Sequence, residues 1–463
     1  MKLPKINWKR AATIVWEWAQ IIWKAKHPTD KPPPSAAAVL CAVAFATLAP
    51  LCQAQAPADT VCTRVTTIVT TTQRGRSVVD SSSLQRCSVG TVPTPPPPSV
   101  PPDTTPAPPP TPPPATLPAW AQAVDRLLGP IPNCAQLATA SGPLREWYDA
   151  WRKWEPARWK ADSARWDAAD YYDRASIYYA MAVCELPHDT VLSATYRARG
   201  DALARNYRDV YVIPNAGGVS AHWSQLEGVA VHALTAGDSL SRRWVGRTAE
   251  RLAVSNYYLK GVVGDTTHID YENRIGQRML LATLLAHALQ VPGASIPATK
   301  WATIADSLVT LNLRAQRPNG SWGFRCLGGG ACQVTFPYMD ALWDDALVRM
   351  LRLRGPDARV LPSVRATVDF HRARAVRADS SWTYNLTPST YGGATASPDL
   401  NGLHPYTWAW LSDQTGDSSY RAAVAPLFLK GVRAGYYSGS KQFNQAFYNS
   451  YRYVALEQRG ATP

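Results

Sequence analysis

Four carboxylates stand near the starts of apolar segments that have helical periodicity, where they could act on a bound substrate. Glu227 opens the run that ends at Gly237, and Asp340 and Asp344 open another. Residues four apart share one helix face, and two close carboxylates raise the pKa of one of them. Glycosidic hydrolysis uses such a pair, one carboxyl protonated and one ionised. We therefore predict Asp340 and Glu227 as catalytic residues, and Asp344 and Glu272 as substrate-binding residues.

Other polar and aromatic side chains stand at the same position in their segments. They are His222, Trp223, Arg274, Tyr338, Asn401, His404 and Tyr406. Helix N-termini carry partial positive charge and free N–H groups. If the helices point the same way, one end of the assembly becomes a polar, electropositive funnel. Imidazoles, phenols, amides and indoles together are typical of a glycan-binding site.

The elements that would position these residues repeat along the chain. The stretch Ser220–Gly237 predicts a buried helix that ends at a glycine turn, followed by a more charged helix. The turn glycines are Gly237, Gly293, Gly355 and Gly416, which are 56, 62 and 61 residues apart. Self-similarity at a nearly fixed period indicates a repeat architecture. With a first copy at Trp166–Glu185 and a last inner helix at Asn444–Glu457, we expect an all-α domain: a closed ring of about six helical hairpins.

In this arrangement residues 119–463 resemble the (α/α)6-toroid carbohydrate-active enzymes, the glycoside hydrolases and polysaccharide lyases that share such a ring. The resemblance implies an active site in the funnel formed by the inner helices. It also implies a second chemistry, because the segment from Asn401 to Tyr406 is similar to an alginate-lyase centre. There Asn401 would neutralise charge, His404 and Tyr406 would act as base and proton donor, and Arg274 would lie near the substrate carboxylate. Hydrolysis and β-elimination both remain open.

One short motif has a different resemblance. Gln316-Arg-Pro-Asn-Gly320-Ser-Trp322 matches the Q-x-x-x-G-x-W motif of terpene cyclases, which repeat it several times. Here it occurs once, and Leu342 stands where the cyclases place the first Asp of their acid motif. We interpret it as a turn, with Trp322 packing or lining the funnel as a substrate-binding residue.

The N-terminal part divides by composition into three segments. Residues 1–56 combine a basic, Trp-rich stretch that could lie on an anionic membrane surface with an apolar run typical of a signal peptide or anchor. Residues 57–91 are Thr-rich and predict a small β-hairpin, and residues 92–118 form a Pro-rich linker. We expect cleavage after Ala54 and an exported protein, in the periplasm, at the cell surface or secreted.

The eight cysteines suit an oxidising compartment. Six of them can pair by neighbourhood, Cys62 with Cys87, Cys134 with Cys184 and Cys326 with Cys332. No metal is expected at Cys326 and Cys332, which have no adjacent histidine or second cysteine pair. The chain has no P-loop, nucleotide fingerprint or zinc-binding H-E-x-x-H, so we expect no cofactor.

Charge points to an anionic partner. The net charge is +14, and residues 119–463 carry 37 Lys and Arg against 29 Asp and Glu, a surplus of 8. The basic residues are scattered, which argues against nucleic acid. We predict an exported enzyme that cleaves an anionic polysaccharide by β-elimination or hydrolysis. The alternative is a non-catalytic glycan-binding or cell-envelope surface protein.

Overall fold

The structure, a computed structural model, describes in full residues 117–167, 170–253, 273–322, 336–386 and 394–460. It also describes the backbone of 71–73 and 76–78. The chain divides into two compact units, Met1–Pro108 and Pro109–Pro463. In the first, β1 (Thr71–Gln73) and β2 (Arg76–Val78) pair antiparallel. The predicted signal segment, Cys62–Cys87 pair and Pro-rich linker lie outside the described residues, as does the Cys326–Cys332 pair.

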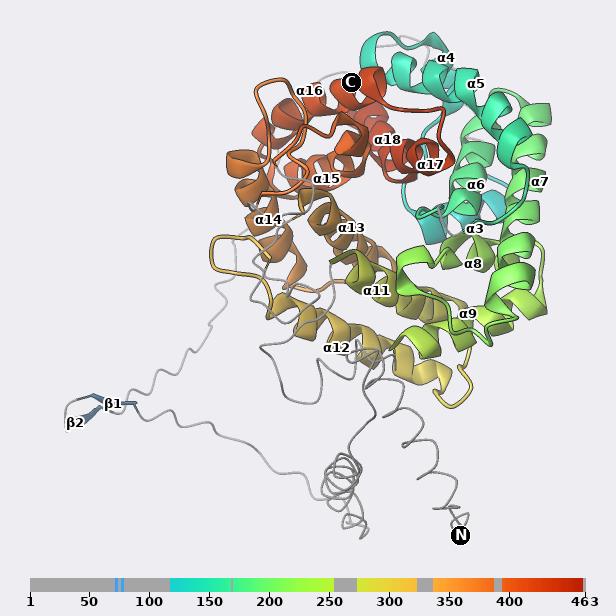
Figure 1. The fold of residues 1–463 in the computed structure, drawn as a ribbon. Coiled ribbons are helices and arrows are strands. Elements are labelled where there is room, and N and C mark those ends of the chain that lie inside the picture. Colours follow the sequence, from blue (N-terminus) through green and yellow to red (C-terminus); the bar gives the residue numbers. More distant parts are fainter. Residues whose placement is uncertain are drawn as a thin grey trace, which may run out of the picture. The chain divides into compact units, whose positions relative to one another are not determined.

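The second unit is a ring of two helical layers, seen along its axis in Figure 1. The inner helices are α6 (Arg174–Glu185), α8 (Leu226–Thr235), α11 (Asn273–Leu289), α13 (Pro337–Leu353), α15 (Pro405–Thr415) and the consecutive pair α17 (Ser440–Tyr448) and α18 (Ser450–Gly460). The outer helices are α5 (Gly142–Asp162), α7 (Thr190–Tyr207), α9 (Ser239–Ala253), α12 (Trp301–Leu313), α14 (Val360–Arg374) and α16 (Ser419–Ala434). The predicted all-α ring of helical hairpins is therefore confirmed within the described residues.

Residue pattern explains which helices lie inside. The inner helix α8 is buried from Leu226 through Ala233, as expected for a segment that is apolar on all sides. The outer helix α5 buries one stripe, Trp147, Tyr148, Trp151 and Glu155, at helical spacing. Its remaining face is polar and faces solvent, so the ring packs its core between the two layers.

Three of the four turn glycines have the backbone conformation that favours glycine. Gly237, Gly355 and Gly416 have φ angles of 64°, 116° and 71°. Gly293 is required for a different reason, because a Cβ there would collide with the carboxylate of Glu250. That carboxylate accepts the backbone N–H groups of the residues that follow, so the turn needs close approach rather than a positive φ.

Two inner helices have boundaries in the structure that differ from the predicted ones. The segment expected from Trp166 becomes helical only at Arg174, because Asp173 caps α6 by accepting the N–H of Ser176 at 3.0 Å. The last inner helix is interrupted at Asn449, between α17 and α18. The loop before α6 thus contributes side chains to the end of the ring instead of to its wall.

Short elements complete this unit. They are α4 (Cys134–Thr139), η2 (Arg208–Val212), η3 (Ala221–Trp223), η4 (Ala298–Lys300) and η5 (Pro398–Leu403). No helix in the described part of the chain is both long and apolar enough to cross a membrane.

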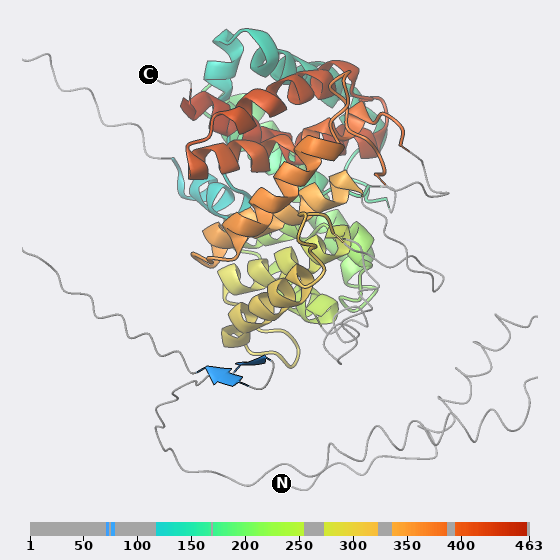
Figure 2. The same cartoon turned by 90° about the vertical axis from the view of Figure 1, so that its left-hand side faces the viewer.

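Helix α3 (Ala119–Leu128) closes one end of the ring, on the left in the side view of Figure 2. Its last carbonyls accept hydrogen bonds from inner-helix side chains: Arg349 donates to Leu127 at 3.1 Å, and Tyr451 donates to Leu128 at 3.1 Å. A disulfide between Cys134 and Cys184 ties the segment after α3 to the C-terminal end of α6, which confirms that predicted pair. The N-termini of the inner helices lie at the opposite end, which we call the mouth.

The turn at 316–322 has a structural repeat at 376–382, after α14. In each, the second residue donates its N–H to the carbonyl of the sixth, Arg317 to Ser321 at 2.8 Å and Arg377 to Ser381 at 3.0 Å. The turn thus occurs twice in the structure. The second copy does not match the sequence motif, because Val376 and Ser380 replace its Gln and Gly.

Candidate functional site

A half-buried tyrosine at the mouth is surrounded by two cations and an indole. The Arg274 guanidinium lies 5.2 Å from the ring centroid of Tyr171, and Nζ of Lys441 lies 4.9 Å from it. The ring of Trp223 meets Tyr171 edge-on, with centroids 6.5 Å apart. Such spacings fit cation–π contacts. These residues come from four different segments of the mouth, and we call Tyr171, Trp223, Arg274 and Lys441 the mouth cluster.

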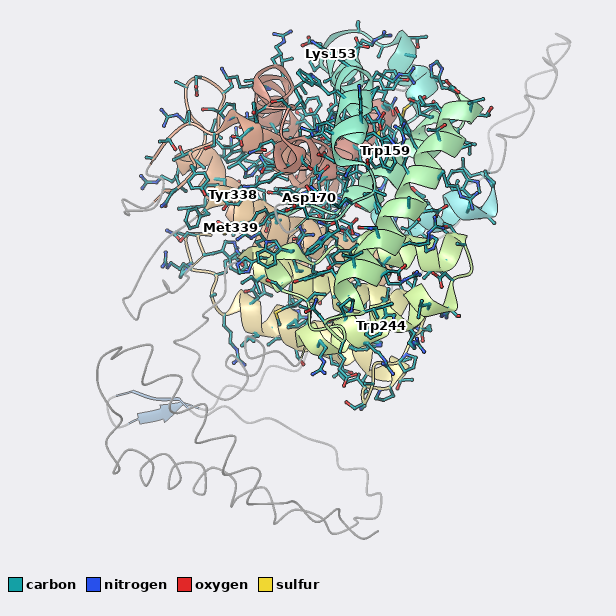
Figure 3. The ribbon with its side chains drawn as sticks, turned by 45° about the vertical axis from the view of Figure 1, so that its right-hand side comes forward. Lys153, Trp159, Asp170, Trp244, Tyr338 and Met339 are labelled. Atoms are coloured by element: carbon teal, nitrogen blue, oxygen red, sulfur yellow. A yellow bond between two sulfur atoms is a disulfide. The ribbon has the colours of Figure 1, made fainter. Side chains whose placement is uncertain are left out.

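A buried carboxyl lies next to the mouth cluster in sequence. Asp170 accepts a hydrogen bond from the Ser440 hydroxyl at 2.5 Å, and its backbone carbonyl accepts one from the Gln225 amide. Burial raises the pKa of Asp170, and the Ser440 hydrogen bond opposes that rise. Figure 3 labels both Asp170, which lies before the start of α6, and Tyr338, which lies in the first turn of α13. A carboxyl whose pKa is raised can act as a proton donor.

Glu227, predicted as catalytic, lies inside an ion network at the centre of the ring. One carboxylate oxygen pairs with Arg349, and the other accepts the hydroxyl of Tyr448. Arg278 and Arg452 each lie 3.8 Å from the carboxylate. Burial alone would raise the pKa of Glu227, but the three guanidiniums lower it. Both carboxylate oxygens of Glu227 are thus occupied by guanidiniums and the Tyr448 hydroxyl, so its geometry is that of a structural ion pair.

Asp340 and Asp344 lie in a second buried cluster. The Asp340 carboxylate accepts the amide of Asn273 at 2.8 Å, and its other oxygen lies 3.1 Å from Nε2 of His371. Burial raises the pKa of Asp340, and burial followed by repulsion from Asp340 holds that of Asp344 well above its usual range. The predicted coupling of this pair is present, but both side chains are at most 1% exposed.

The residues predicted for β-elimination are also buried. Asn401 uses its amide entirely on backbone: it donates to the carbonyls of Ser380 and Leu427, each at 2.8 Å, and accepts the N–H of Trp382. His404 is fully buried, and burial holds its pKa well below its usual range. Tyr406 is 5% exposed, lies beside Arg452, and burial raises its pKa to about 12. Arg274, expected beside them, contacts Tyr171.

The remaining predicted residues are divided between the mouth and the core. His222 is half-buried beside Trp223, with ring centroids 6.4 Å apart. Tyr338 stacks on Tyr384, with centroids 5.6 Å apart. Trp322 is fully buried in the packing between α12 and α14, and its Nε1 donates to Thr367 at 3.1 Å. Glu272 lies outside the described residues.

Of the residues of the site, Lys441 carried no prediction. Asp170 and Tyr171 were expected among the polar side chains of the funnel, near the start of an inner helix from Trp166, but without a catalytic or binding role; they precede α6. Lys441 is the second residue of α17, which begins four residues earlier than expected. The signal was the shared position: each stands at an inner-helix start, as the predicted residues do. Among the described residues, no three or more His, Cys, Asp or Glu are grouped to hold a metal ion.

No protein-family model matches the chain, and neither does any curated protein. Several solved structures are similar to it, among them the following two. One is an unsaturated glucuronyl hydrolase, responsible for the degradation of glycosaminoglycan, from Bacillus sp. GL1, and the other is a UGL variant with dGlcA-Glc-Rha-Glc. Each is 14% identical, with a TM-score of 0.45, and the match covers 66% of this chain and 94% of the other. At that level the likeness carries no conclusion about this chain's substrate or reaction.

Proposed function

We propose that this chain is an exported carbohydrate-active enzyme that hydrolyses an anionic glycan at the mouth of the ring. The observation that carries the proposal is that Asp170, a carboxyl bound by Ser440 whose pKa burial raises, directly precedes Tyr171, whose ring lies between two cations. The buried Cys134–Cys184 disulfide supports export, because disulfides persist in oxidising compartments.

The mouth cluster fits a sugar that carries a negative charge. A pyranose ring packs its C–H face on an aromatic side chain, and Tyr171 and Trp223 are both half-buried. Arg274 and Lys441 would bind the carboxylate or sulfate of that sugar, and the N-termini of the inner helices add partial positive charge. The cluster therefore selects for an acidic over a neutral glycan.

Hydrolysis is favoured over elimination by where the candidate groups lie. Elimination needs a base and a neutralising amide that touch the sugar, but His404 and Asn401 are fully buried and the amide of Asn401 is used by backbone. Asp170 directly precedes Tyr171, and its carboxyl would donate a proton to the glycosidic oxygen as the bond from that oxygen to C1 breaks. The water that bonds to C1 would return a proton to the carboxylate. The Ser440 hydroxyl would hold that carboxyl in place.

The test is turnover of a panel of acidic and neutral polysaccharides by the full chain and by Asp170→Asn. We expect cleavage of an acidic polymer, with kcat lowered about a hundredfold or more in the variant and glycan affinity retained. Asp189→Asn is the matched control, because Asp189 caps α7 at the opposite end of the ring and asparagine caps equally well. Undiminished turnover by Asp170→Asn would contradict the assignment.

A second candidate is a glycan-binding protein without catalysis. It is favoured by one observation, the burial of every described carboxyl considered for the site: Asp170 is 4% exposed, and Glu227, Asp340 and Asp344 are at most 2% exposed. Binding of acidic glycans without any new reducing end would support it over the enzyme.

A further inference from the structure

A second group of aromatic rings lies beside the mouth cluster. Trp166 stacks on Tyr211, with ring centroids 4.0 Å apart and planes inclined by 19°. Trp166 belongs to the segment between α5 and α6, and Tyr211 to the π-helical turn η2 between α7 and α8, so both stand on the mouth side. Both are half-buried. π-Turns are frequent at functional sites, and this one carries Tyr211 onto the indole.

The pair is held in place by hydrogen bonds. The hydroxyl of Tyr211 accepts the N–H of Ser220 at 3.0 Å, and the backbone N–H of Trp166 donates to Asn206 at 2.8 Å. The indole Nε1 of Trp166 is itself buried, with no hydrogen-bond partner among the described residues. What this indole presents to solvent is therefore carbon, the part of the ring that packs on a sugar.

The pair is also continuous with the mouth cluster. The ring centroid of Tyr207 lies 5.7 Å from that of Trp166 and 5.7 Å from that of Tyr211. The Tyr207 hydroxyl donates to the carbonyl of Trp223 at 3.2 Å. Trp223 in turn meets Tyr171. An uninterrupted run of contacts thus joins Trp166 to the two cations around Tyr171.

We propose that Trp166 and Tyr211, which we call the ledge, form a second sugar subsite that binds the next ring of the glycan held by the mouth cluster. The proposal rests on the proposed function for the identity of that glycan. No cation of the described residues lies over either ring of the ledge, so the ledge binds the apolar face of a sugar and contributes chain-length preference rather than charge selection. Longer acidic oligosaccharides would then bind more tightly than a disaccharide.

The test is calorimetric titration of the full chain with uronic-acid oligosaccharides of two to six units, prepared from pectate, alginate and hyaluronan. We expect the affinity to rise on the order of tenfold between the disaccharide and a longer oligomer. Trp166→Ala and Tyr211→Ala should each remove most of that rise and leave disaccharide affinity unchanged. Tyr211→Phe, which keeps the ring, should retain it.

Trp120→Ala is the matched control. Trp120 is also half-buried and lies beneath the guanidinium of Arg197, 4.8 Å from its ring. Arg197 donates to the carbonyl of Thr235 at the C-terminal end of α8, so this indole stands at the end away from the mouth. Its removal should leave the rise in affinity intact.

A wild-type affinity that does not depend on oligosaccharide length would contradict the proposed subsite, and so would a rise in affinity with length that persists in Trp166→Ala. Where that variant does not fold, oxidation of the wild-type chain by N-bromosuccinimide gives the answer: a longer oligomer should protect Trp166 and a disaccharide should not. Equal protection would count against the subsite. Turnover is measured separately, so an inactive chain that still shows the length-dependent affinity would refute the proposed function and retain the ledge.

Discussion

The imidazole of His404 stacks on the indole of Trp382, with ring centroids 3.6 Å apart and planes inclined by 15°. Both side chains are buried, and neither nitrogen of His404 has a hydrogen-bond partner among the described residues. Burial disfavours the charged imidazolium, so this histidine is neutral at ordinary pH. A side chain in that position packs the inner layer and does not reach a sugar at the mouth.

His404→Phe follows from that contact. Phenylalanine keeps a ring against Trp382 and removes two polar atoms that are buried without partners, each of which costs about 1–3 kcal/mol. The free energy of unfolding should stay within about 1 kcal/mol of the wild-type value or rise, and turnover should be retained. Urea unfolding and a cleavage assay check both. Loss of turnover in a folded variant would show that His404 takes part in catalysis.

Asp344 and Asp345 are adjacent, but their replacement by asparagine should change stability by very different amounts. Asp345 contacts Arg452 at 3.1 Å, so Asp345→Asn leaves a buried cation short of its partner and should lower stability by about 3 kcal/mol. Burial and repulsion from Asp340 hold the pKa of Asp344 well above its usual range, which favours the neutral carboxyl that an asparagine amide resembles. Asp344→Asn should therefore change stability by less than about 1 kcal/mol at neutral pH.

The raised pKa of Asp344 also predicts how the stability of Asp344→Asn relative to the wild type changes with pH. A carboxyl whose pKa is higher in the folded state binds more protons there, so the contribution of Asp344 to wild-type stability falls as pH rises above about 4, the unfolded value. Asp344→Asn has no such group, and its stability relative to the wild type should improve with rising pH. Denaturant midpoints at several pH values measure this, and a relative stability that declines with pH would show Asp344 to be ionised.

The two repeated turns share a left-handed backbone position that is occupied by glycine in one and by serine in the other. Gly320 has a φ of 86° and Ser380, its counterpart, a φ of 58°. A left-handed conformation costs a non-glycine residue about 1 kcal/mol, so Ser380→Gly should stabilise the chain by up to that amount. Gly320→Ser should destabilise it, because a Cβ there would collide with the carbonyl oxygen of Ala366. Thermal unfolding of both variants checks the pair; equal shifts would contradict it.

Arg274→Gln tests charge recognition at the mouth. Removing one of the two cations around Tyr171 should raise KM for an acidic glycan about tenfold and leave that for a neutral glycan unchanged. The control is Arg247→Gln, because Arg247 lies 5.3 Å from the ring of Trp244 on an outer helix. Equal effects of the two variants would mean that Arg274 acts only through packing.

The fold was predictable because its signals are periodic. Glycine turns such as Gly237 and Gly416, and the contrast between the apolar α8 and the charged α9, specify the ring without tertiary information. The site was less predictable because a side chain's exposure at the mouth depends on how far its residue lies from the start of its helix. Glu227 and Asp340 stand near helix starts, as Arg274 does, but the first two lie at most 2% exposed in polar networks. Only the packing of distant helices creates those networks.

Hydrolysis of an anionic glycan is tested most directly by cleavage in water enriched in the heavy isotope of oxygen. Hydrolysis with Asp170 as acid breaks the bond between C1 and the glycosidic oxygen, so it places one heavy oxygen atom per cleavage on C1 of the new reducing end and leaves both fragments saturated. Elimination incorporates none and leaves an unsaturated sugar at the new non-reducing end. Mass spectrometry of the oligosaccharides should show one heavy oxygen per cut in saturated fragments, and none with Asp170→Asn. Unsaturated products without the isotope would contradict hydrolysis.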